Sequence, residues 1–76
     1  MHKVILNPLK KYLEGNILKH KANVEIYLKN SIGIGEHSDI LETIEIELER
    51  MANYNDKLEM LNKYFNEEDT TEILND

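Results

Sequence analysis

Apolar residues recur every three or four positions through the second half of this chain. Between residues 39 and 65 the spacing continues without a glycine or a proline. Such spacing is typical of one apolar face on a long helix. The sequence therefore predicts a helix over about residues 39–65, with Asp39 and Glu42 as a capping box at its start. The predicted face consists of Leu41, Ile44, Leu48, Met51, Asn55, Leu58, Asn62 and Phe65.

The first half of the chain repeats this spacing and predicts a second helix over about residues 8–30. Pro8 suits the first turn of a helix, and Asn7 suits the capping position before it. We therefore expect the helix to begin at Pro8 and to end near Asn30. Its apolar face consists of Leu9, Leu13, Ile17, His20, Val24 and Tyr27.

Three segments leave alternatives open. A glycine inside a helix costs roughly 1 kcal/mol relative to alanine, so a kink at Gly15, or two shorter helices, is the alternative to one continuous helix there. Residues 24–28 alternate in the way a strand does, which is the alternative to helix there. At the C-terminal end, Asp69 and Glu72 form a second capping-box pattern. That pattern predicts a short helix carrying Ile73 and Leu74, with a loose tail as the alternative.

The connection between the helices indicates how they are arranged. Residues 30–39 contain Gly33 and Gly35, which can take positive φ and turn the chain. The expected fold is an all-α antiparallel helical hairpin that forms a single domain over residues 1–76. Each apolar face would then be covered on one flank only, leaving a larger apolar patch than soluble monomers usually expose. We therefore expect two copies to form a four-helix bundle. The expected interface comprises Leu41, Ile44, Leu48, Met51, Leu58 and Phe65, with Val24 and Tyr27 opposite.

Polar residues on these faces have two interpretations. A buried asparagine costs stability but rejects wrong registers, which Asn55 and Asn62 would do at a bundle seam. In the alternative, Tyr54 and Leu61 take the core positions and both asparagines lie at the edge. His20 lies on the face of the first helix, where we expect a hydrogen-bonded core or interface histidine.

The charge distribution supports a contact between unlike helices. The 76 residues carry a net charge of −6 and no cysteine, so the chain has no disulfide to stabilise a small core. Residues 1–30 hold six lysines and two glutamates, a net of +4, whereas residues 31–76 have a net of −10. We interpret this as a basic helix beside an acidic one, in the same chain or in a neighbouring copy. The alternative is a weak nucleic-acid binder, although the lysines lack an arginine among them and the acidic half would repel the backbone. These lysines are Lys3, Lys10, Lys11, Lys19, Lys21 and Lys29.

Candidate chemistry is sparse. Glu36, His37 and Asp39 form the one local group with metal-ligand character, which makes a metal-binding protein or metal-dependent hydrolase an alternative function. Because the apolar face claims the inward positions, we expect the carboxylates of residues 42, 45 and 49 to form a solvated acidic surface. We find no catalytic arrangement, so we expect no enzyme and no cofactor. The chain also has no run typical of a signal peptide or membrane span, which predicts a cytoplasmic protein that is not secreted and does not enter a membrane.

One stretch resembles a known group of proteins. The turn Ile34-Gly35-Glu36-His37-Ser38-Asp39-Ile40 is preceded by residues 23–28 and followed by residues 56–61 of matching character. Over about residues 20–65 the chain resembles small uncharacterised proteins of tailed phages that infect marine cyanobacteria and related bacteria. The resemblance brings no activity or cofactor. It implies a viral origin and a place in the virion or in the cytoplasm of an infected cell. We therefore expect a structural or regulatory interaction module that works through homo-oligomerisation.

Overall fold

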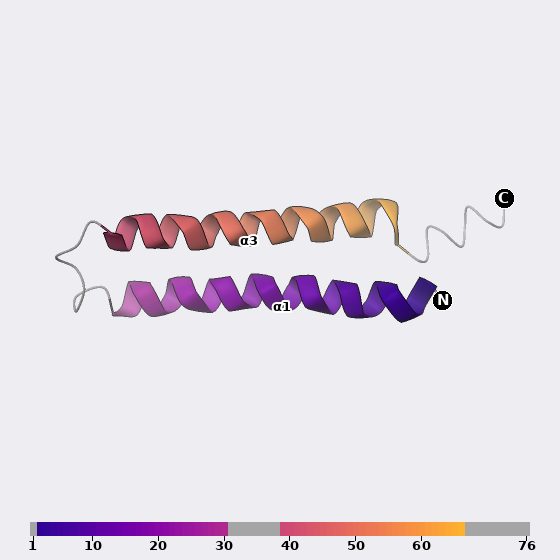
Figure 1. Ribbon diagram of the computed structural model, residues 1–76, viewed down its shortest axis with the longest axis horizontal. Helices are drawn as coiled ribbons and strands as arrows, with labels where there is room; N and C mark the ends of the chain where they lie inside the picture. The colour runs from indigo at the N-terminus through magenta and orange to yellow at the C-terminus, as the bar shows by residue number, and fades with distance from the viewer. Residues whose placement is uncertain (1, 31–38, 67–76) are drawn as a thin grey trace.

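Two helices form the fold. The computed structural model describes residues 2–30 and 39–66, in which α1 spans His2–Lys29 and α3 spans Asp39–Tyr64. The helices lie side by side and run in opposite directions, so the start of α1 and the end of α3 share one end of the molecule (Figure 1). At 1.5 Å per residue they are about 42 and 39 Å long. The predicted all-α antiparallel hairpin is confirmed.

The start of α1 differs from the prediction. The helix begins at His2 rather than at Pro8, and Pro8 lies inside it. Proline lacks the N–H that would bond to the carbonyl of Val4, so this arrangement costs one helical hydrogen bond. The earlier start places Leu6 seven residues before Leu13, on the same side of the helix, and both are only 5% exposed. Burial of Leu6 offsets the cost at Pro8.

The remaining boundaries agree with the expectations. No break occurs at Gly15, and residues 24–28 are helical rather than extended. A Cβ added at Gly15 would meet no atom within 4 Å, because this part of the helix faces solvent. The second helix begins at Asp39 and ends one residue before the predicted Phe65. The glycine-containing connection and the short C-terminal helix expected near Asp69 lie outside the described residues.

The helices meet along one inward line on each, defined by residues seven apart that are buried or half-buried. Among the described residues, Leu6 and Leu13 are the buried apolar side chains, and no side chain is completely buried. Two layers of helix therefore enclose only a thin core. The inward line of α1 is Leu6, Leu13, His20 and Tyr27, and the inward line of α3 is Ile40, Glu47, Tyr54 and Leu61.

The inward line of α3 corrects the predicted face by one residue. Leu41 and Leu48 were expected to point inward, but they are 73% and 51% exposed. Glu47 takes the inward position beside Leu48. Within the single hairpin, Tyr54 and Leu61 take the half-buried positions, whereas Asn55 and Asn62 are exposed beside them. The amide of Asn55 donates a hydrogen bond to Glu59 at 3.3 Å, on the surface of the same helix.

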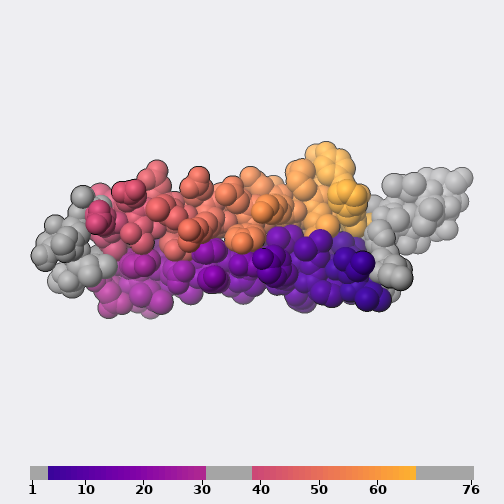
Figure 2. Space-filling view, viewed as in Figure 1, coloured from indigo at the N-terminus to yellow at the C-terminus, as the bar shows by residue number. Residues whose placement is uncertain are grey.

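Each inward line has a flank on either side. We call the residues one or four positions after an inward residue the trailing flank, and those one or four positions before it the leading flank. In the space-filling view the two helices pack directly against each other (Figure 2). No third layer covers the face that is visible there. The trailing flank includes Ile17, Val24, Leu41, Ile44, Leu48, Met51, Leu58 and Phe65, and the leading flank includes Ile5, Leu9, Tyr12, Lys19, Arg50, Asn53, Lys57 and Met60.

Candidate functional site

The centre of the helix–helix contact is polar. His20 and Glu47 are 5% and 8% exposed, and the Nδ1 atom of His20 lies 2.5 Å from Oε1 of Glu47. A carboxylate can only accept, so the Nδ1–H of His20 donates this bond. The amide of Asn23 donates to the same oxygen at 3.0 Å. Every buried side-chain nitrogen and oxygen in the described residues has a partner, and the hydrogen-bonded role expected for His20 is confirmed.

Glu47 is held as a carboxylate by its neighbours. The hydrogen bond from His20 is the largest cause of a lowered pKa at this carboxyl, and the bond from Asn23 is the next. Burial acts in the opposite direction, and the charges of His20 and Arg50 lower the pKa further. The guanidinium Nη1 of Arg50 lies 3.9 Å from the second carboxylate oxygen. Donors from both helices therefore stabilise a negative charge between them.

An aromatic cluster covers one side of this polar pair. The ring of Tyr54 stacks on the imidazole of His20, with centroids 5.9 Å apart and planes 12° apart. The ring of Tyr12 meets the Tyr54 ring edge-on, with centroids 6.5 Å apart and an angle of 83° between the planes. The Nζ atom of Lys57 lies 5.2 Å from the Tyr54 centroid, in cation–π range. Tyr54 thus joins the polar centre to the apolar layers toward the end that holds the start of α1.

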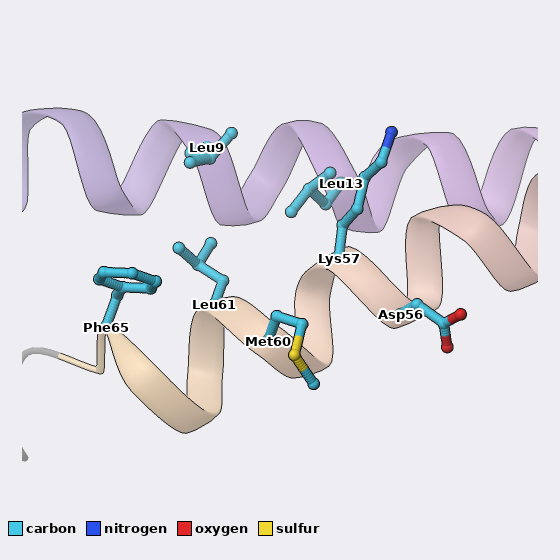
Figure 3. A pocket seen from close by; sticks show the side chains of 7 residues that line it. All are labelled: Leu9, Leu13, Asp56, Lys57, Met60, Leu61 and Phe65. Carbon is cyan, nitrogen blue, oxygen red and sulfur yellow. The ribbon is translucent and has the colours of Figure 1, made fainter.

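An apolar groove of about 400 Å³ lies between the helices at that end (Figure 3). Leu61 and Phe65 point from α3 toward α1, whereas the carboxylate of Asp56 points away from α1 (Figure 3). The groove is open, because the chain in the described residues has no third element to cover it. Its lining comprises Leu9 and Leu13 of α1 with Asp56, Lys57, Met60, Leu61 and Phe65 of α3.

The residues expected at a dimer interface fall into two sets. Val24, Tyr27, Ile44, Met51 and Leu58 are half-buried by the contact between α1 and α3. Leu41, Leu48 and Phe65 are exposed. All of these residues except Tyr27, which is on the inward line, belong to the trailing flank. The hairpin alone therefore covers this flank incompletely.

The described residues give little support to the other candidate sites. Glu36 and His37 lie outside them, and Asp39 is an exposed residue at the start of α3. Within the described ranges no three histidine, aspartate or glutamate side chains are placed to hold a metal ion. The carboxylates at positions 42, 45 and 49 are exposed, as predicted. Neither α1 nor α3 has the length and apolar character needed to cross a membrane.

Sequence reasoning missed Glu47 and its partner Asn23. The two residues are 24 positions apart, so no local spacing joins them. A usable signal was present in the seven-residue repeat, because Ile40, Tyr54 and Leu61 predict an inward position at 47 as well. The same repeat places His20 inward on α1. Each line carries one polar residue besides its tyrosine, and this was the available indication of a buried pair.

The described residues hold a polar pair inside the hairpin and apolar side chains on its surface. The buried carboxylate is already occupied by donors from His20 and Asn23, and the exposed apolar residues offer contact area. Comparison of the chain with protein-family models, with curated proteins and with solved structures gives no match. The function is therefore argued from the geometry.

Proposed function

We propose that this hairpin is a non-enzymatic interaction module that pairs with a second copy through the trailing flank, forming a four-helix bundle. The observation that carries the proposal is the thin core. Leu6 and Leu13 are the buried apolar side chains in the described residues, whereas Leu41, Leu48 and Phe65 are left exposed along one flank. A second hairpin laid on this flank gives each helix a further neighbour and removes these side chains from water.

The dimensions of the flank match a dimer interface. Leu41 and Phe65 are 24 positions apart, which corresponds to about 36 Å along a helix. Two helices packed side by side present a face about 20 Å wide, because each is about 10 Å across. A face of this length and width is on the order of 700 Å² per partner, close to the roughly 800 Å² of a standard stable interface.

Charge complementarity favours a second copy over an unrelated partner. The helix α1 holds six lysines and two glutamates, a net of +4, and α3 holds seven acidic and three basic residues, a net of −4. When two hairpins stack with α1 of one copy over α3 of the other, unlike charges meet on both sides. The reverse stacking places like charges together, which is unfavourable. The expected partner is thus a copy in the first arrangement.

In this proposal the protein works by assembly, as a small structural or regulatory component. The resemblance of residues 20–65 to small proteins of tailed phages extends the proposal to a virion or an infected cell. The test of self-association depends on neither of these locations. The test rests on side chains that the structure places on the surface.

Leu48→Glu tests the proposal, with Leu18→Glu as the matched control. Both leucines are exposed on a helix, 51% and 61% respectively, but Leu18 lies on the outer face and in neither flank. We expect light scattering on a sizing column to give twice the chain mass for the native protein and for Leu18→Glu. Leu48→Glu should give the single-chain mass, because burying the new carboxylate at the interface is unfavourable.

Thermal unfolding of the native protein is a second test, and it does not require the Leu48→Glu variant to fold. The unfolding midpoint of a native dimer rises with protein concentration, because association stabilises the folded state by mass action. A helical native protein with the single-chain mass at every concentration, and with a constant midpoint, would refute the proposal. A Leu48→Glu variant that stays dimeric would refute the choice of flank.

A further inference from the structure

A polar cleft of about 330 Å³ opens on the leading flank, midway along the hairpin. Its volume is at the lower end of the range for sites that bind small molecules. Both helices contribute to it, so its shape depends on the folded hairpin. The lining comprises Lys19 and His20 of α1 with Arg50, Asn53, Tyr54 and Lys57 of α3.

The cleft concentrates positive charge in an acidic protein. Three of its six lining residues are cationic, although the chain as a whole carries −6. Lys19 and Lys57 form no ion pair with any acidic residue in the described ranges, in contrast to Lys11, which lies 3.7 Å from Glu14. Arg50 shares the carboxylate of Glu47, which His20 and Asn23 already contact. The three cations are therefore poorly neutralised by the protein itself.

His20 also lines the cleft, although the residue is only 5% exposed. Its Nδ1 is engaged by Glu47. The buried pair with Glu47 therefore fixes one wall of the cleft.

We propose that this cleft binds the phosphate group of a small molecule. Lys19, Arg50 and Lys57 surround the site from two helices, which suits a tetrahedral dianion with several acceptor oxygens better than a planar carboxylate. The amide of Asn53 is an uncharged donor at the same site. The cleft is on the flank opposite the one proposed for self-association, so the two proposals stand or fall separately.

Lys57→Gln tests the site, with Lys63→Gln as its matched control. Both lysines are on α3 and lie 5.2 Å from a tyrosine centroid, Lys57 over Tyr54 and Lys63 over Tyr64, but only Lys57 lines the cleft. The probes are inorganic phosphate and pyrophosphate, titrated into the full chain labelled for amide NMR. We expect saturable shifts at Lys19, Arg50, Asn53 and Lys57. Loss of a charge-assisted contact should weaken binding about tenfold in Lys57→Gln and leave Lys63→Gln near the native value.

A comparison of two ligands on the native protein shows how much of the ligand the cleft recognises. Saturable binding with equal results for free phosphate and a nucleoside monophosphate indicates that the phosphate alone is recognised. Tighter binding of the nucleotide places its base on the adjacent aromatic cluster. Shifts that grow without saturation, or equal weakening in Lys57→Gln and Lys63→Gln, would overturn the proposal.

Discussion

Replacing Glu47 by glutamine should remove part of the pH dependence of folding. The structure places this carboxylate between the helices, where Nδ1 of His20 and the amide of Asn23 donate to one oxygen. Glutamine keeps the size of the side chain and one acceptor oxygen but carries no charge. The substitution thus tests the charge while leaving the packing of the layer nearly unchanged.

The magnitude follows from the contacts that are lost. Hydrogen bonds to a charged group contribute about 1.5–3 kcal/mol, compared with about 1 kcal/mol for neutral pairs. Glu47 accepts two such bonds, one buried and one half-buried. We expect Glu47→Gln to destabilise the fold by about 1–3 kcal/mol at neutral pH. Glu47→Ala should cost about 3–5 kcal/mol, because it leaves the donors of His20 and Asn23 unpaired.

The sign of the pH effect follows from the lowered pKa of Glu47. The folded carboxyl holds its proton less tightly than the unfolded one, because the hydrogen bond from His20 favours the charged form. This stabilisation is fully present above the ordinary pKa of a glutamate. As the pH falls through the lowered folded pKa it is lost, since the unfolded chain binds more protons over that interval. Glu47→Gln lacks this contribution altogether.

The assay is urea unfolding at a series of pH values and at one protein concentration. A fixed concentration is needed because any association adds to the apparent stability. The native protein should lose more stability than Glu47→Gln between neutral and acidic pH, so the two curves converge at the acidic end. A variant that loses as much stability as the native protein on acidification would refute the buried, hydrogen-bonded carboxylate.

Two further predictions concern α1. Leu13→Ala should destabilise the protein by about 2–5 kcal/mol, because Leu13 is one of the buried apolar side chains, whereas Leu18→Ala on the exposed face should change stability by less than about 0.5 kcal/mol. Equal effects in urea unfolding would contradict the assigned inward line. Gly15→Ala should stabilise the protein by about 0.5–1 kcal/mol, because the site is helical and exposed and a Cβ there meets nothing within 4 Å. A loss of stability in Gly15→Ala would indicate a partner or a kink at this position.

The sequence predicted the hairpin because both helices carry a long three-and-four repeat. It also predicted the start of the second helix, since Asp39 and Glu42 provide local capping signals. It was wrong about the first helix, where Pro8 has the pattern of a helix start. The decisive contribution there is the burial of Leu6 against the other helix. Such a contact depends on residues distant in sequence, which a local signal does not report.

The error at Glu47 has a different cause. On the second helix two neighbouring lines repeat every seven residues, one beginning at Leu41 and one at Ile40. The line that begins at Leu41 is more apolar near the centre of the helix, because it places Leu48 there, whereas the other line places Glu47 there. The structure selects the second line, since His20 supplies a partner for the carboxylate from the other helix. A charge is acceptable inside when its partner is fixed in place, and a pattern of single positions does not show partners.

The buried pair also explains how two helices with thin apolar faces select one register. Counting seven residues in opposite directions from the contact between His20 and Glu47 sets Leu13 opposite Tyr54 and Leu6 opposite Leu61. If one helix slid by a single repeat, Glu47 would face Leu13 or Tyr27, and the carboxylate would lose both of its donors. Apolar residues alone would penalise that shift less, because a core of hydrophobic side chains can repack when its total volume is kept. The polar layer penalises it by the cost of an unpaired buried charge, so the pair fixes the alignment on which both flanks depend.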